Sequence, residues 1–126
     1  MSVTYFGTGR TPRRRLARAV SVDAEFIPQA ILRASISHIS EVLGIAAISL
    51  SDDLDEFDGV TIQPENLDFP VAIRHYAGHP PETVTVYFPY EVNEVDRISA
   101  AVALIVEDLH LNTQDIFWQR KDNPEL

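Results

Sequence analysis

The chain contains no cysteine. Disulfide bonds, thiol catalysis and cysteine-ligated zinc are therefore excluded. Five glycines among 126 residues leave little material for a dinucleotide-binding or phosphate-binding glycine loop. Long apolar runs are also missing, because the longest, Val42 to Ser51 and Ile98 to Val106, fall well short of the roughly 18 residues that a membrane span requires. No secretory signal is visible, so we expect a cytoplasmic protein with no membrane partner.

Acidic residues are missing from the start of the chain. Residues 1–22 carry five arginines and no acid, whereas residues 23–126 carry a net charge of −14, which gives −9 for the whole chain. This asymmetry predicts a basic N-terminal arm on an acidic body. The arm could contact nucleic acid, serve as a transit peptide, dock on the acidic body or be a solvated terminus. The acidic body repels DNA, which argues against nucleic acid as the main partner.

Apolar periodicity predicts two helices. The first begins at Pro28, or earlier at Asp23, and ends at Gly44, because apolar residues recur between them at three- and four-residue spacings: Ile31, Leu32, Ile36, Ile39, Val42 and Leu43. The second covers residues 94–110, with Asn93 as its N-cap. Its apolar stripe comprises Ile98, Ala101, Val102, Ile105 and Leu109.

Strands are predicted over residues 45–51, 60–63, 71–76, 83–90 and 115–121, and one more within residues 3–6 or 16–22. Residues 71–76 and 83–90 read as a hairpin in which Arg74 lies opposite Thr85 and Ala72 opposite Tyr87.

We therefore expect an α+β fold. It would be a two-layer sandwich with a mainly antiparallel sheet of about five strands and two helices on one face, like a split βαβ plan with extra strands. The domain would cover residues 23–121, with residues 1–22 as the basic arm or an extra strand and 122–126 as a loose tail.

Polar residues gather on the sheet face that the helices would leave open. Alternation places Ser49, Thr61, Gln63 and Thr83 there, together with four candidates for binding: Arg74, Tyr76, Thr85 and Tyr87. Tyrosine and arginine are typical of binding platforms, although threonine and tyrosine are also common on an ordinary solvated sheet face.

The last strand contains three consecutive apolar residues, Ile116, Phe117 and Trp118. Because neighbours on a strand point in opposite directions, a sheet with one open face cannot bury all three. The N-terminal arm, another subunit or a partner would have to cover Phe117 and Trp118. Self-association as a homodimer is the cover that we expect.

Residues 52–59 hold five acids in eight positions, including the binding candidates Asp53, Asp55 and Glu56. Clustered carboxylates suit calcium, but no spacing here matches the calcium loop of an EF-hand. The segment is therefore predicted to be a solvated hairpin loop or a surface that pairs with a basic patch.

Reactive side chains are densest from Arg74 to His79. His75 and His79 are four residues apart, but a strand end and a turn lie between them, so the spacing does not align them for zinc. Motifs for a nucleophile or a dinucleotide are missing as well. We accordingly predict no catalytic residue, no metal site and no cofactor.

These observations favour a non-enzymatic domain that binds another protein through its acidic loop and open sheet face, as a homodimer. The alternative is a small-molecule binder or enzyme with a pocket formed by Arg74, His75, Tyr76 and His79. A third hypothesis is nucleic-acid contact through the arginine arm.

Overall fold

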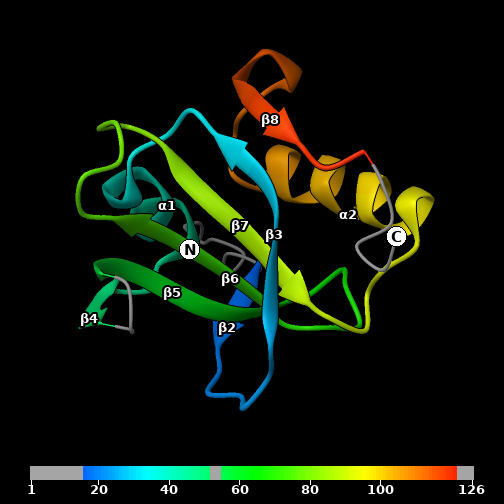
Figure 1. Cartoon of the computed structure of the whole chain (residues 1–126), viewed down its shortest axis with the longest axis horizontal. Helices are drawn as coiled ribbons and strands as arrows, with labels where there is room; N and C mark the ends of the chain where they lie inside the picture. The colour runs from blue at the N-terminus through cyan, green and yellow to red at the C-terminus, as the bar shows by residue number, and fades with distance from the viewer. Residues whose placement is uncertain (1–15, 52–54, 122–126) are drawn as a thin grey trace, which may run out of the picture.

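A computed structural model describes residues 16–51 and 55–121 of the chain (Figure 1). This part forms an α+β fold with a seven-stranded antiparallel sheet and two α-helices, which confirms the predicted class. In chain order its elements are β2 (Ala17–Ala19), β3 (Phe26–Leu32), α1 (Ile36–Leu43), β4 (Ile48–Ser51), β5 (Glu56–Pro64), β6 (Val71–Tyr76), β7 (Val84–Pro89), α2 (Val95–Asp108), a 3₁₀ turn at Thr113–Asp115 and β8 (Ile116–Gln119).

The strand order is β2-β5-β6-β7-β3-β8, and β4 also pairs with β5. Two short strands share one side of β5, because β4 pairs with its first half and β2 with its last residues. The sheet therefore has two margins, one formed by β4 and β2 and the other by β8. Figure 1 places β4 and β8 far apart.

The β6–β7 hairpin has the register that the sequence predicts. Ala72 lies opposite Tyr87, Ile73 opposite Val86 and Arg74 opposite Thr85. The sequence pattern specifies this register, because a shift by one residue would bring inward-pointing side chains of one strand opposite outward-pointing side chains of the other.

The predicted first helix is wrong over its first half. Residues 26–32 form β3, which lies between β7 and β8 in the sheet. Pro28 does not begin a helix but precedes a β-bulge, where the pairing with β7 shifts between Pro28 and Ala30. Bulges accommodate proline in a strand because one residue there is released from the regular pairing.

Helix α1 is correspondingly short and has a cap at each end. The Oγ of Ser35 accepts a hydrogen bond from the backbone N–H of His38 at 3.0 Å. At the other end Gly44 adopts a left-handed conformation (φ 68°), and its N–H donates to the carbonyl of Ser40. The helix end at Gly44 is thus confirmed, since glycine takes this conformation without steric cost.

Replacing Ser35 with alanine should lower the free energy of unfolding by about 1 kcal/mol, because the N–H of His38 then loses its acceptor. Urea denaturation followed by circular dichroism measures the change. Ser37→Ala is the matched control, since Ser37 is exposed within the same helix and alanine favours helix there. Equal stabilities for the two variants would contradict a capping role for Ser35.

Helix α2 confirms the predicted apolar stripe. Its buried residues, with Leu109 just beyond its end, are Ile98, Ala101, Val102, Ile105 and Val106. The N-cap position is occupied by Glu94, not by the predicted Asn93, and its side chain makes no capping bond. A side-chain bond joins the two helices, because Nε2 of His38 donates to the carbonyl of Leu109 at 2.9 Å.

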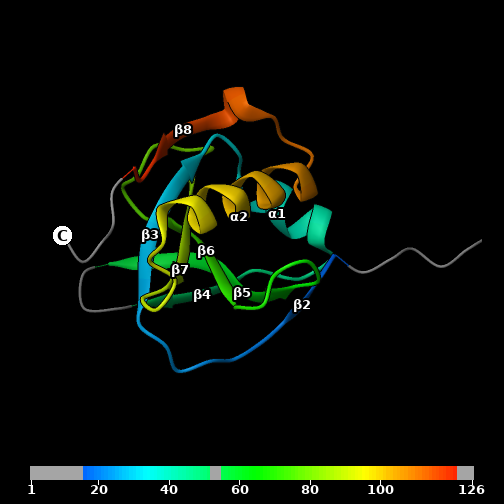
Figure 2. The same cartoon turned by 90° about the vertical axis from the view of Figure 1, so that its right-hand side faces the viewer.

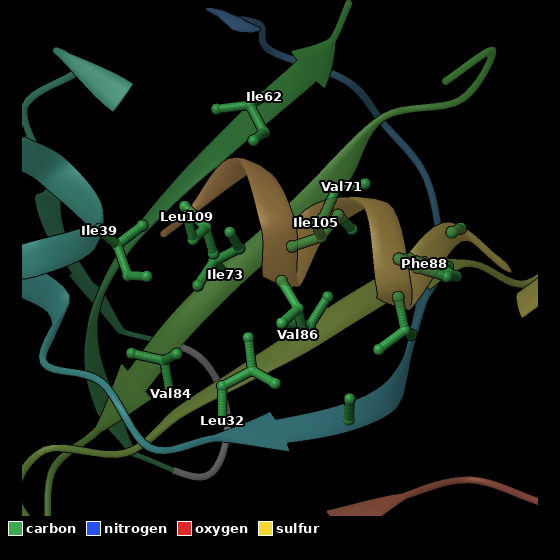
Figure 3. Packing of buried hydrophobic residues seen from close by; sticks show 14 of the residues in the cluster. Leu32, Ile39, Ile62, Val71, Ile73, Val84, Val86, Phe88, Ile105 and Leu109 are labelled. Atoms are coloured by element: carbon green, nitrogen blue, oxygen red, sulfur yellow. The ribbon is translucent and has the colours of Figure 1, made fainter. Parts of the chain in front are cut away.

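One hydrophobic core joins both helices to one face of the sheet. Ile39 of α1 and Ile105 of α2 belong to the same cluster as Ile73 and Val86, which project from the centre of the sheet (Figure 3). The sheet curves around α2, with β8 on one side of the helix and β5 and β2 on the other (Figure 2). The opposite face is therefore not covered by these two helices.

In two strands, β5 and β2, the extent or place differs from the prediction or was left open by it. Strand β5 is nine residues long, whereas the sequence predicts only residues 60–63. Strand β2 falls within residues 16–22, one of the two places where the sequence allows an extra strand. The other place, residues 3–6, and the predicted tail lie outside the described residues, as does most of the basic arm.

Candidate functional site

The sheet face that points away from the core, which we call the outer face, is defined by strand alternation. Val60, Ile73 and Val86 are buried in the core, so their neighbours along each strand point the other way. Across the strands the pairings connect a row of outer-face positions: Ile48, Gly59, Arg74, Thr85, Ile31 and Trp118. Leu50, Phe57 and Tyr76 form a second row.

Arg74 lies at the centre of an aromatic cluster on the outer face. Its guanidinium carbon is 4.6 Å from the ring centre of Phe57, 4.9 Å from that of Tyr87 and 5.9 Å from that of Phe26. One nitrogen, Nη1, donates to the hydroxyl of Tyr76 at 3.2 Å. Such contacts stabilise the cation and hold its planar fork in place.

Gly59 makes room for the stem of Arg74. A Cβ atom at Gly59 would lie 2.8 Å from the carbonyl oxygen of Ile73 and 3.0 Å from Cγ of Arg74. Only glycine allows this close approach, since real Cβ atoms do not come so near to backbone atoms. Arg74 can therefore occupy this position because residue 59 has no side chain.

The charge of the outer face is opposite to that of the protein. Its described strand positions include two arginines, Arg74 and Arg18, and no acid, in a chain of net charge −9. The acids of β5, Glu56 and Asp58, alternate to the other face. Among the described residues no carboxylate forms an ion pair with Arg74; the ion pair found there joins Arg97 to Asp68. The guanidinium thus has aromatic neighbours and a hydroxyl neighbour, and keeps donors for an anion.

Three of the predicted binding residues, Arg74, Tyr76 and Tyr87, lie together on the outer face. His79 joins them at the margin, with its ring 5.7 Å from that of Tyr76. Thr85 differs from the prediction, because its side chain is buried among its neighbours and is not exposed for contact with a partner. His75 points to the other face, where its Nδ1 donates to the carbonyl of Thr83 at 2.8 Å.

The sequence prediction missed several apolar members of the outer face, including Ile31, which it assigned to the first helix. Phe57 was assigned to the acidic loop, and Phe26 either to the region before the first helix or to its first turn. The sequence predicts Ser49 on the outer face and Ile48 and Leu50 on the inner face. The structure shows the reverse arrangement. Ser49 lies opposite Asp58 on the other face and donates to its Oδ1 at 2.5 Å. Alternation shows which residues of a strand share a face, but it does not show which of the two faces is covered. For β4 burial gives no further indication, because all four of its residues are exposed.

The acidic segment is only partly a loop. Asp55 precedes β5, and its carboxylate accepts the N–H of Glu56 at 2.8 Å. Glu56, Phe57 and Asp58 belong to β5, so the predicted eight-residue loop is wrong over its second half. Asp53, the third acidic candidate, lies outside the described residues. Glu56 and Asp58 lie next to β4 and alternate to the face opposite Arg74.

Phe117 and Trp118 are both exposed on β8, as the run of three apolar residues suggests. Pairing with β3 shifts between Ile31 and Leu32, which leaves Phe117 as the extra residue of β8. The guanidinium of Arg33 lies 5.2 Å from the centre of the Phe117 ring. No element in the described part of the chain buries these two rings.

Four hollows between described side chains all lie away from Arg74, His75, Tyr76 and His79. One, of about 440 Å³, lies between α2 and the loop before β6, and another of about 530 Å³ is lined by Phe117, Trp118 and Lys121. Residues 16–51 and 55–121 contain no group of three or more histidines and acids placed to hold a metal ion.

Comparison with known proteins yields no match, whether to family models, to curated proteins or to solved structures. Neither helix in the described ranges is long and apolar enough to cross a membrane.

Proposed function

We propose that the protein is a non-enzymatic interaction domain that binds another protein through the outer face of its sheet. In this proposal the fold works as a two-layer sandwich, with both helices on the concave face and the outer face left to the partner. The observation that carries the proposal is the guanidinium of Arg74, enclosed by three aromatic rings and without a carboxylate partner among the described residues.

A carboxylate of the partner is the group that fits this cluster. Arginine binds carboxylates through two parallel hydrogen bonds, and Arg74 is already oriented by the rings and by the hydroxyl of Tyr76. Little conformational entropy is then lost on binding, which favours affinity. Arginine and aromatic residues of this kind are the usual hot spots of protein interfaces.

The test compares the tagged protein with its Arg74→Gln variant in capture of partners from a lysate of its source, followed by mass spectrometry. We expect one stoichiometric protein with wild type and at least about tenfold weaker binding with Arg74→Gln, equivalent to about 1.4 kcal/mol. Arg74→Lys should also bind weakly, because an ammonium group cannot form the double hydrogen bond.

Arg97→Gln is the matched control. Arg97 also lies over an aromatic ring, 5.2 Å from the centre of Phe69, but it is on α2 and already paired with Asp68 at 2.9 Å. The control should retain full binding. Equal capture by wild type and Arg74→Gln would refute the proposed role of the outer face.

A further inference from the structure

Both margins of the sheet expose apolar side chains on short strands. At one margin Ile48 and Leu50 of β4 are 57% and 50% exposed. At the other, Phe117 and Trp118 of β8 are 59% and 41% exposed. In the described part of the chain β4 pairs only with β5, and β8 only with β3, so each strand has one open side. Open strand sides can pair with another strand through backbone hydrogen bonds.

The residues next to β4 are mainly acidic and those next to β8 mainly basic; Arg18 of β2 and Asp115, directly before β8, are the exceptions. Glu56 and Asp58 pair directly with β4, so acids border that margin. At the β8 margin Arg33 lies against the ring of Phe117, and Lys121 lines the hollow of about 530 Å³ that Phe117 and Trp118 share. Phe117 and Trp118 are adjacent on the strand and both line this hollow, so it borders β8. The hollow is a place where an extended segment can lie.

These charges distinguish two modes of self-association. In a symmetric dimer through β8 the basic groups of the two copies would face each other, and a symmetric dimer through β4 would bring acids together. Both arrangements are opposed by like-charge repulsion. Pairing the β8 margin of one copy with the β4 margin of the next brings basic groups toward the acids that lie behind β4 and covers apolar residues on both sides.

We propose that copies of this chain associate head to tail, with β8 of one copy added to β4 of the next. Such a contact is heterologous, so it extends into chains or closes into a ring, and does not stop at a symmetric dimer. The occupant of each margin is thus a second copy of the protein. This assembly uses the margins of the sheet and does not depend on the anion-binding role of Arg74.

Sedimentation equilibrium of two charge variants tests this arrangement. Leu50→Lys places a cation where the basic margin would dock, and Phe117→Glu places an acid where the acidic margin would dock. Wild type should show an average mass that rises with concentration from micromolar to near-millimolar and falls when salt is added. Each variant alone should remain at the mass of one chain.

The mixture of the two variants is decisive. Leu50→Lys keeps a functional β8 margin and Phe117→Glu keeps a functional β4 margin, so an equimolar mixture should form a complex of twice the monomer mass and grow no further. Matched controls are Val22→Lys and Tyr90→Glu, two similarly exposed apolar residues on neither margin, which should assemble as wild type does. Circular dichroism of every variant checks that it is folded.

Three outcomes would overturn the proposal. The first is a wild-type chain that stays at the mass of one copy at every concentration. The second is a mixture of folded variants that stays monomeric. The third is a Leu50→Lys variant that still dimerises alone, which would show a symmetric contact through β8.

Discussion

Replacing Gly59 with valine should lower the free energy of unfolding by about 3 kcal/mol. The new Cβ would lie 2.8 Å from the carbonyl oxygen of Ile73, and this neighbour is backbone at the centre of the sheet, paired on both sides. Relief would require β5 and β6 to move apart. Glycine is ordinarily a poor strand residue, so the usual gain from a β-branched substitution at this site would be outweighed by the overlap.

The loss of stability is measured by urea denaturation followed by circular dichroism. Thr61→Val is the matched control, because Thr61 is on the same strand and the same face, two residues away, and already has a β-branched side chain. It should change the free energy of unfolding little. A Gly59→Val variant as stable as this control would show that the approach of β6 to Gly59 is not tight.

Replacing Gln29 with leucine should raise the free energy of unfolding by about 1 to 3 kcal/mol. Gln29 occupies the bulge of β3 and is fully buried, yet neither its Oε1 nor its Nε2 has a hydrogen-bond partner among the described residues. Leucine has a similar size and no polar atoms, so it removes the desolvation cost of the amide while keeping most of the packing. Few single substitutions stabilise a protein by this much.

Gln63→Leu is the matched control and should have the opposite sign. The Nε2 of Gln63 donates to the carbonyls of Leu67 at 2.7 Å and Pro64 at 3.2 Å, so leucine there removes bonds that are already made. Urea denaturation of both variants measures the two changes. A Gln29→Leu variant less stable than wild type would show that the amide of Gln29 is satisfied in the folded protein.

The sequence predicted the parts of the fold whose partners are close along the chain. Residues 71–76 and the following strand pair across a short loop, so alternation within each strand was enough to give both the pairing and the placement of Arg74 beside Tyr87. Helix α2 was also predictable, because its apolar stripe is continuous over three turns.

Strand β3 was not predictable in the same way. Its partners are β7 and β8, more than 50 and more than 80 residues away, so no local pattern specifies them. The bulge at Gln29 interrupts the alternation of the strand, and Ile31 and Leu32 happen to fall at helical spacing from the stripe of α1. Tertiary pairing thus decided a segment for which local periodicity indicated a helix.

The aromatic cluster around Arg74 was incomplete for the same reason. Arg74 and Tyr87 belong to the hairpin, but Phe26 comes from β3 and Phe57 from a strand that begins within an acidic run. Neither residue lies in a segment that alternates clearly. The sequence therefore showed a polar face, whereas the structure shows a cation enclosed by rings and bordered by exposed apolar side chains.

The position of β3 also bears on how the chain folds during synthesis. The strand is made before both of its partners, because β7 follows it by about 50 residues and β8 is the last strand of the described chain. Until β7 has been made, an apolar segment containing Phe26, Ile27 and Ile31 has no neighbouring strand, and one of its sides stays open until β8 follows. Contacts between residues so distant in sequence form slowly, and unpaired apolar strands are prone to aggregate in the meantime. The growing chain therefore leaves β3 unpaired while about 50 further residues are made, and this is the interval in which its apolar side chains are most open to aggregation.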